Sequence, residues 1–108
     1  MSAVSIHEQD FQQQVINADR PVLVDYWAPW CGYCRRIGPA YELIADQFDA
    51  EVEIVKINID EEAELANAEA IEVIPTLVMY KGGKAVNSIV APESKAMIES
   101  FIWESMDK

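Results

Sequence analysis

The sequence has few of the residues that characterise several large classes of protein. Its 108 residues include only 2 cysteines and 1 histidine, too few for a multi-disulfide scaffold or for a structural zinc site with four ligands. It has only 4 glycines and 5 prolines and no low-complexity tract, which excludes fibrous and disordered classes. Its longest apolar stretches have the length of strands and are too short to span a membrane. We therefore predict one globular domain over residues 1–108.

Basic residues are also scarce, with 8 Lys and Arg against 19 Asp and Glu and a formal net charge of -11. Such an acidic surface repels phosphate backbones and anionic lipid headgroups, so we expect no nucleic-acid partner and no membrane partner. The first residues lack the basic segment and apolar run of a signal peptide. We expect a cytoplasmic protein, and a monomer by default.

Strand-like and helix-like segments alternate along the chain, which is typical of an α/β fold. The predicted order is β-α-β-α-β-α-β-β-α. Residues 22–27 form a nearly continuous apolar run, the pattern of a strand buried on both faces. Ser5 and Glu8 have the spacing of a helix capping box, and Met97 belongs to the apolar stripe of the last helix. The other strands are predicted over 3–6, 52–58, 76–80 and 85–90, and the two middle helices over 31–48 and 60–70.

Cys31 and Cys34 stand where the apolar run gives way to the second helix. The first turn of a helix has free backbone N–H groups and a partial positive charge, which stabilise a thiolate at Cys31. A thiolate is the attacking species in disulfide exchange, and Cys34, one turn further along, is placed to attack the mixed disulfide that results. The pattern predicts a redox-active dithiol, with one half of a zinc site as the alternative.

A specific signature is formed by Val24 to Cys34, Pro39, Lys56 to Asp60 and Ile74-Pro75-Thr76. Through these residues nearly the whole chain resembles the thioredoxin family. The resemblance implies one thioredoxin domain, with a central mixed sheet flanked by helices. It also implies an electron carrier in cell redox homeostasis that reduces disulfide-containing proteins and is itself reduced by a thioredoxin-reductase-like donor. We expect no cofactor and no metal.

Asp25 is a carboxylate inside the apolar run of residues 22–27. Burial raises the pKa of a carboxyl group, and a carboxylate with a raised pKa can act as a general base near neutral pH. The resemblance implies that Asp25 deprotonates Cys34 when the mixed disulfide is resolved, and that Lys56 lies near this carboxylate and tunes it. The alternative is a carboxylate at the end of the strand that faces solvent.

Ile74 and Pro75 match a loop that, by the resemblance, has a cis peptide bond and faces the dithiol. X-Pro is the bond type that tolerates cis. The resemblance also implies that the exposed backbone of Ile74 pairs with a substrate strand and that Trp30 contacts substrates at the rim of the site. Trp27 is expected beneath the active-site loop. The alternative for Pro75 is an ordinary trans proline that starts a strand.

The sequence departs from the family pattern in two loops that border the dithiol. Gly32-Tyr33 stands where thioredoxins usually have Gly-Pro, and the Tyr33 N–H, which proline lacks, could donate to the Cys31 sulfur. An added donor would stabilise the thiolate and make the disulfide more oxidising. Ala91 stands where the family usually has glycine, so its methyl group and the following Pro92 are expected to alter the choice of substrate or reductase.

Two alternatives to a disulfide reductase remain open. The absence of proline between the cysteines suggests an oxidase or isomerase of disulfides. A non-catalytic interaction module, or a domain that binds a metal or an iron–sulfur cluster between two chains, could use the same fold. Cys31, Cys34, Asp25 and Pro75 are all present, which argues against a scaffold because scaffolding needs none of them.

Overall fold

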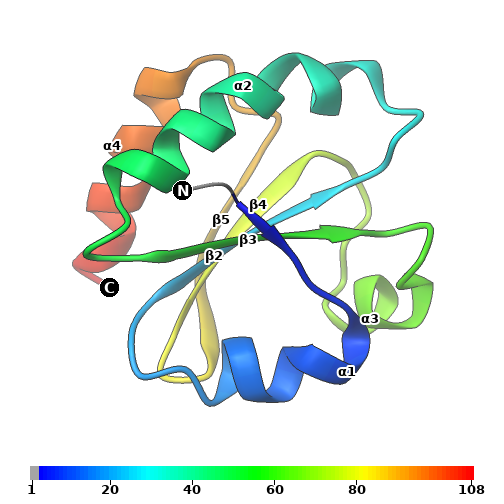
Figure 1. Ribbon diagram of the computed structural model, residues 1–108, viewed down its shortest axis with the longest axis horizontal. Helices are drawn as coiled ribbons and strands as arrows, with labels where there is room; N and C mark the ends of the chain where they lie inside the picture. The colour runs from blue at the N-terminus through cyan, green and yellow to red at the C-terminus, as the bar shows by residue number, and fades with distance from the viewer. Residues whose placement is uncertain (1–2) are drawn as a thin grey trace.

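The computed structural model describes residues 3–108, and its elements follow the order predicted from the sequence (Figure 1). The fold is α/β, with a five-stranded mixed sheet between helices. The strands are β1 (Val4–Ser5), β2 (Val22–Trp27), β3 (Glu53–Asn58), β4 (Thr76–Lys81) and β5 (Lys84–Val90). The helices are α1 (Glu8–Phe11), which continues as a π-helical turn η1 (Gln12–Ile16), α2 (Gly32–Gln47), α3 (Ala63–Ala68) and α4 (Lys95–Met106).

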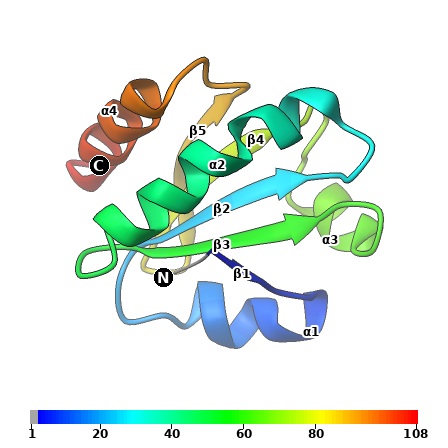
Figure 2. The same ribbon diagram turned by 45° about the horizontal axis from the view of Figure 1, so that its top comes forward.

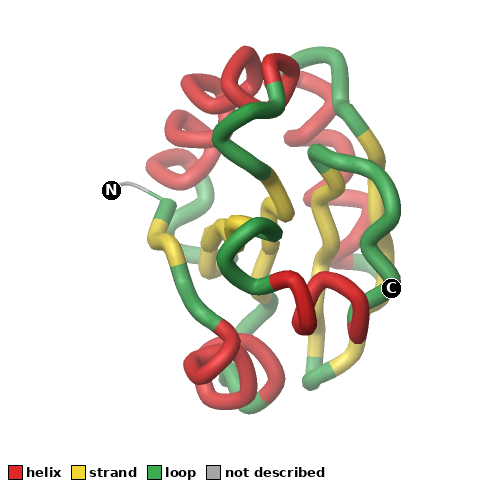
Figure 3. The backbone as a smooth tube through the Cα atoms, turned by 90° about the vertical axis from the view of Figure 1, so that its right-hand side faces the viewer, coloured by secondary structure: helices red, strands yellow, loops and turns green. Residues whose placement is uncertain are grey.

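The sheet has the strand order β1-β3-β2-β4-β5, so β2 lies at its centre. The strands β1 and β2 both pair with β3 in parallel, whereas β2 with β4 and β4 with β5 are antiparallel. The helices α2 and α4 cover one face, and α1 and α3 lie on the other (Figures 1 and 2). Figure 3 shows the same layers from the side. None of the helices in the described part of the chain is long and apolar enough to cross a membrane.

Alternation along β2 sends its side chains to opposite faces of the sheet. Val24 and Tyr26 belong to the core beneath α1 and α3, whereas Leu23 belongs to the core beneath α2 and α4. Asp25 shares the face of Leu23 and is therefore buried under α2. The prediction of a strand buried on both faces is confirmed, because residues 22–26 are all buried. This register brings a carboxyl group beneath the helix that begins just after Cys31.

The predicted capping box at Ser5 and Glu8 is wrong. Ser5 is the last residue of β1, and His7 is the N-cap of α1. The carboxylate of Asp10 accepts the His7 N–H at 3.2 Å, and the carboxylate of Glu62 accepts the Glu8 N–H at 2.7 Å. The capping box of α1 is thus formed by His7 and Asp10, two positions beyond the predicted one, and a carboxylate from a distant loop adds to it.

Two details of the later helices also differ from the prediction. The helix α3 is shorter than residues 60–70, and Ala70 just beyond its end has a positive φ of 59°, a left-handed conformation that interrupts a right-handed helix. In α4, the Ser94 hydroxyl accepts the Met97 N–H at 3.2 Å as an N-cap. Ile98 and Phe101 are buried as expected, but Met97 is 40% exposed because it sits in the first turn, at the edge of the packed face.

Candidate active site

Cys31 and Cys34 form a disulfide at the start of α2, with their Cα atoms 5.2 Å apart. Cys31 is the N-cap, and its Sγ accepts the Cys34 N–H at 3.1 Å. A side chain at the N-cap accepts from the second or third residue of the helix, and Cys34 is the third. The expectation that Tyr33 provides this N–H is therefore wrong for the disulfide form. The helix N-terminus does direct a backbone donor at the sulfur of Cys31.

The disulfide lies in a small apolar cluster at this end of the sheet. Ala28 is buried with the two cysteines, and Trp27, Tyr33, Ile59 and Ile74 pack against them. The packing of Trp27 beneath the site and of Ile74 against it agrees with the expectation from the sequence. The sequence did not single out Ile59 as a site residue.

The Ile74–Pro75 peptide bond is cis, as the resemblance implied. The backbone of Ile74 makes no hydrogen bond within residues 3–108, which leaves its N–H and C=O available. Trp30 is 65% exposed and precedes the disulfide, so the structure places it at the rim. The rim tryptophan, the dithiol and the free backbone of Ile74 thus surround one end of the sheet.

Asp25 is only 4% exposed, so the alternative of a solvent-facing carboxylate is wrong. Burial raises the pKa of Asp25 from 3.8 to about 7, with the positive charge of Lys56 opposing the rise and the negative charge of Glu42 adding to it. Within the described residues, Oδ1 of Asp25 is buried and has no hydrogen-bond partner. A carboxyl group in this state changes its protonation near neutral pH.

Lys56 lies next to Asp25 in the register between β2 and β3. Its ammonium group is 3.5 Å from Oε2 of Glu42 and 5.5 Å from the centre of the Trp27 ring, a distance at which a cation interacts with the ring face. The other carboxylate oxygen of Glu42 accepts the Ala3 N–H at 2.9 Å. Glu42 could not be predicted as a site residue, because no local pattern in the sequence shows that α2 brings it over Lys56.

A cavity of about 230 Å³ connects these groups with Cys34. It is large enough for water, and polar groups in its wall could bind such molecules. The residues that line it are Asp25, Trp27, Cys34, Arg35, Gly38, Tyr41, Glu42 and Lys56. Asp25 and Cys34 therefore share one polar cavity beneath α2.

Tyr41 fixes α2 to the sheet beside this cavity. Its hydroxyl lies 3.1 Å from the Leu23 carbonyl and 2.8 Å from the Val55 carbonyl, and it is fully buried. Burial raises the pKa of Tyr41 well above its ordinary value, and the charges of Asp25 and Glu42 add to the rise. Tyr41 therefore stays protonated and holds α2 over β2 and β3. No local pattern in the sequence predicts this role for Tyr41 either.

Comparison with known proteins decides the family. The thioredoxin family model matches residues 2–104 of the chain. The chain is 41% identical over 102 residues to the thioredoxin of Porphyra purpurea, with 94% of this chain and 95% of that protein covered. The chain belongs to the thioredoxin family. It is also 40% identical over 101 residues to thioredoxin 1 of Nostoc sp., with 94% of each chain covered. With the thioredoxin of Haemophilus influenzae it shares 38% over 97 residues, covering 90% of this chain and 91% of that protein.

Membership and the disulfide geometry together establish the class of function. The protein is a thioredoxin-type protein-disulfide oxidoreductase, an electron carrier whose redox-active group is the Cys31–Cys34 pair. Its partners are those of the family in general, which are disulfide-containing proteins and reductases.

The two segments that depart from the thioredoxin pattern, the first turn of α2 and the loop that follows β5, are in direct contact. The Tyr33 hydroxyl donates to the Pro92 carbonyl at 2.9 Å, and the Arg36 guanidinium lies 5.7 Å from the centre of the Tyr33 ring. Ala91 has a positive φ of 46°, the conformation for which glycine is the usual residue, and its N–H donates to the Pro75 carbonyl at 2.8 Å. Ala91 thus adopts a left-handed backbone conformation that is strained for a residue with a Cβ atom.

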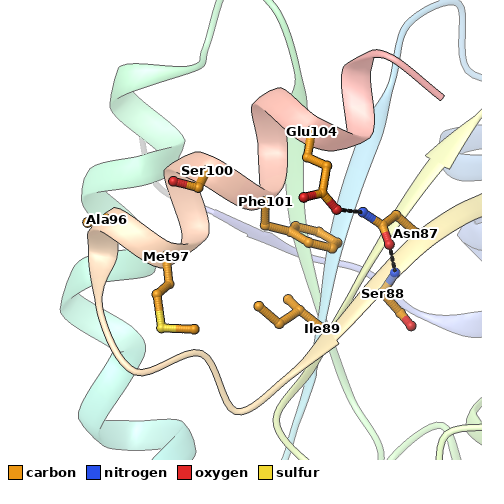
Figure 4. Close-up of a pocket in the computed structure, with 8 residues that line it drawn as sticks. All are labelled: Asn87, Ser88, Ile89, Ala96, Met97, Ser100, Phe101 and Glu104. Atoms are coloured by element: carbon orange, nitrogen blue, oxygen red, sulfur yellow. Dashed lines mark hydrogen bonds between the residues drawn. The ribbon is translucent and has the colours of Figure 1, made fainter.

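Other candidate sites in the described residues contain none of the predicted site residues. An open cavity of about 400 Å³ lies between β5 and α4 (Figure 4). The Asn87 amide in its wall donates to Glu104 at 3.3 Å and to Ser105 at 3.1 Å, so these polar groups bond to one another. His7, Glu61 and Glu62 have possible ligand atoms within 4.8 Å of one another. Glu62 there already bonds to the N–H of Glu8 and to His7, and so supports the start of α1.

Proposed function

We propose that this thioredoxin reduces protein disulfides with Cys31 as nucleophile and Cys34 as resolving thiol. The Cys31 thiolate attacks one sulfur of the substrate, forms a mixed disulfide and releases the other substrate sulfur as a thiolate. Cys34 then attacks the Cys31 sulfur, which re-forms the Cys31–Cys34 disulfide and releases the second substrate thiol. The observation that carries this order is the Cys34 N–H at 3.1 Å from the Cys31 sulfur, a donor that stabilises negative charge there. Cys31 is also the more exposed of the two, at 8% against 4%.

Asp25 is proposed as the general base that takes the proton from Cys34. Its pKa of about 7 suits a group that accepts and releases a proton at neutral pH. Asp25 and Cys34 line the same cavity, so the proton can pass between them through water in that space. Lys56 and Glu42 act on the pKa of Asp25 in opposite directions and are proposed as positioning residues.

The substrate is proposed to bind as an extended strand beside Ile74. The free N–H and C=O of Ile74 can pair with such a strand, which is recognition of backbone rather than of sequence. Pro75 sets the direction of this loop, and exposed Trp30 offers apolar contact area. Gly32 and Ala91 border the strand on either side. We further propose that the protein acts as a cytoplasmic monomer with a thioredoxin-reductase-like electron donor.

Reductase-coupled reduction of insulin tests the proposal. The wild-type protein should reduce insulin at the expense of the donor, and Cys31→Ser should abolish the reaction. Cys34→Ser should also abolish turnover, because the mixed disulfide is no longer resolved within the protein. Full activity of Cys34→Ser would contradict the resolving role.

An oxidase or isomerase is a second candidate, favoured by the Gly32-Tyr33 dipeptide, which stands where thioredoxins usually have Gly-Pro. In the reduced protein the Tyr33 N–H, which proline lacks, is proposed as an added donor to the Cys31 thiolate, which would stabilise the thiolate relative to the disulfide. We expect a reduction potential less negative than the value of about -270 mV known for thioredoxin. Equilibration with glutathione buffers measures this potential, and a value at or below -270 mV would remove the support for oxidase function.

A further inference from the structure

The side chain of Tyr33 reaches from the first turn of α2 to the loop that follows β5. Its hydroxyl donates to the Pro92 carbonyl at 2.9 Å, across 59 positions of sequence. The ring is half-buried and lies against the guanidinium of Arg36 at 5.7 Å. The hydroxyl thus links the helix start that holds the disulfide to the loop that follows β5.

The same loop is held on its other side by the loop of the cis proline. The Ala91 N–H donates to the Pro75 carbonyl at 2.8 Å. Residues 91 and 92 are therefore bonded to both of the segments between which a substrate strand beside Ile74 would lie. A proline between the cysteines, the usual residue in the family, has no hydroxyl and could not make the bond from Tyr33.

We propose that Tyr33 is a specificity-determining residue, whose bond to Pro92 narrows the site beside the dithiol and favours slender disulfide segments over wide, folded ones. The inference rests on the proposed function, in which a substrate strand pairs with Ile74. A strand paired there lies about 4.8 Å from the Ile74 backbone, next to the loop that Tyr33 closes.

The cost of widening the site follows from the bond itself. A wide segment has to displace the Tyr33 hydroxyl, which leaves the carbonyl of buried Pro92 without its donor. A small disulfide fits beside Ile74 without moving the hydroxyl. Discrimination between the two kinds of substrate should therefore depend on a single O–H group.

Tyr33→Phe removes that hydroxyl and keeps the ring. The pre-reduced full-length protein is mixed with insulin, a folded protein disulfide, and separately with oxidised glutathione, a small one, and tryptophan fluorescence follows each single turnover. We expect the ratio of the second-order rate constants, insulin over glutathione, to rise about five-fold in Tyr33→Phe, which equals about 1 kcal/mol at 1.4 kcal/mol per tenfold, the size of one net hydrogen bond. A change in thiol reactivity alone would act on both substrates and cancel in the ratio.

Tyr80→Phe is the matched control, because the Tyr80 hydroxyl donates to Glu69 on the opposite face of the sheet. It should leave the ratio at its wild-type value. An unchanged or lower ratio in Tyr33→Phe, with both substrates still reduced, would overturn the specificity role and leave the proposed function standing. If the wild-type protein reduces neither substrate, the proposed function fails and this inference fails with it.

Discussion

Replacing Asp25 by asparagine should stabilise the folded protein at neutral and alkaline pH. Asp25 is buried, and Oδ1 has no hydrogen-bond partner among the described residues. Its pKa is raised from 3.8 to about 7, mainly by burial. In the unfolded chain this group therefore ionises at a pH about three units lower than in the folded protein. The free energy of unfolding of the wild type consequently falls as the pH rises from about 4 to about 7. Asparagine has nearly the same shape and does not ionise.

The size of the effect follows from the two pKa values. Each pKa unit corresponds to about 1.4 kcal/mol, so the ionised carboxylate costs the folded state about 4 kcal/mol at pH 8. At pH 4 the folded protein holds Asp25 protonated, and the penalty is nearly absent. The difference in the free energy of unfolding between Asp25→Asn and the wild type should therefore grow by about 4 kcal/mol from pH 4 to pH 8.

Urea unfolding of both oxidised proteins at pH 4 and pH 8, followed by circular dichroism, measures this difference. All other titrating groups are the same in the two proteins, so their contributions cancel. An advantage of Asp25→Asn that is equal at the two pH values would refute the reasoning, because it would show that Asp25 is not ionised at a cost. A wild-type protein that is the more stable of the two at pH 8 would refute it as well.

Two further predictions follow from neighbouring contacts. Lys56→Met should raise the pKa of Asp25, because it removes a positive charge that lowers this pKa, and Glu42→Gln should lower it, because it removes a negative charge that raises it. Carbon-13 NMR titration of the Asp25 carboxyl group measures both shifts. Shifts of the pKa in the same direction in the two variants would contradict the opposing roles. Ala91→Gly should stabilise the protein by about 1 kcal/mol, the cost of a left-handed conformation for a residue with a Cβ; a lower urea midpoint in this variant would show that φ of 46° carries no strain.

The layout of the fold could be predicted because its signals are local. The continuous apolar run of β2, the Gly82-Gly83 turn of the β4–β5 hairpin, where both φ values are positive, and Ser94 as the cap of α4 are each determined by neighbouring residues. The prediction of the N-terminal cap of α1 was wrong, in part because a residue far away in the sequence contributes to it. The capping box is formed by His7 and Asp10 instead. Glu62, which lies 54 positions from Glu8, accepts a further N–H of this helix start, and no pattern around Ser5 shows that contact.

The candidate site, too, has features that local sequence predicts and features that depend on distant contacts. The dithiol at a helix N-terminus and the carboxyl group in an apolar strand could both be predicted from neighbouring residues. The structure brings Asp25, Cys34 and Lys56 to one cavity. Glu42, Tyr41 and the Tyr33–Pro92 bond could not be predicted. They depend on where α2 lies over the sheet and on which loop meets its first turn, and both are set by packing between segments far apart in the chain.

Trapping of the mixed disulfide tests the central claim most directly. Pre-reduced Cys34→Ser, incubated with insulin and analysed by mass spectrometry under non-reducing conditions, should yield a covalent adduct between an insulin chain and Cys31. Cys31→Ser should yield little adduct, because Cys34 lacks the backbone N–H donor that the Cys31 sulfur has. The assignment of nucleophile and resolving thiol would be contradicted if Cys31→Ser formed the adduct through Cys34 while Cys34→Ser formed none through Cys31.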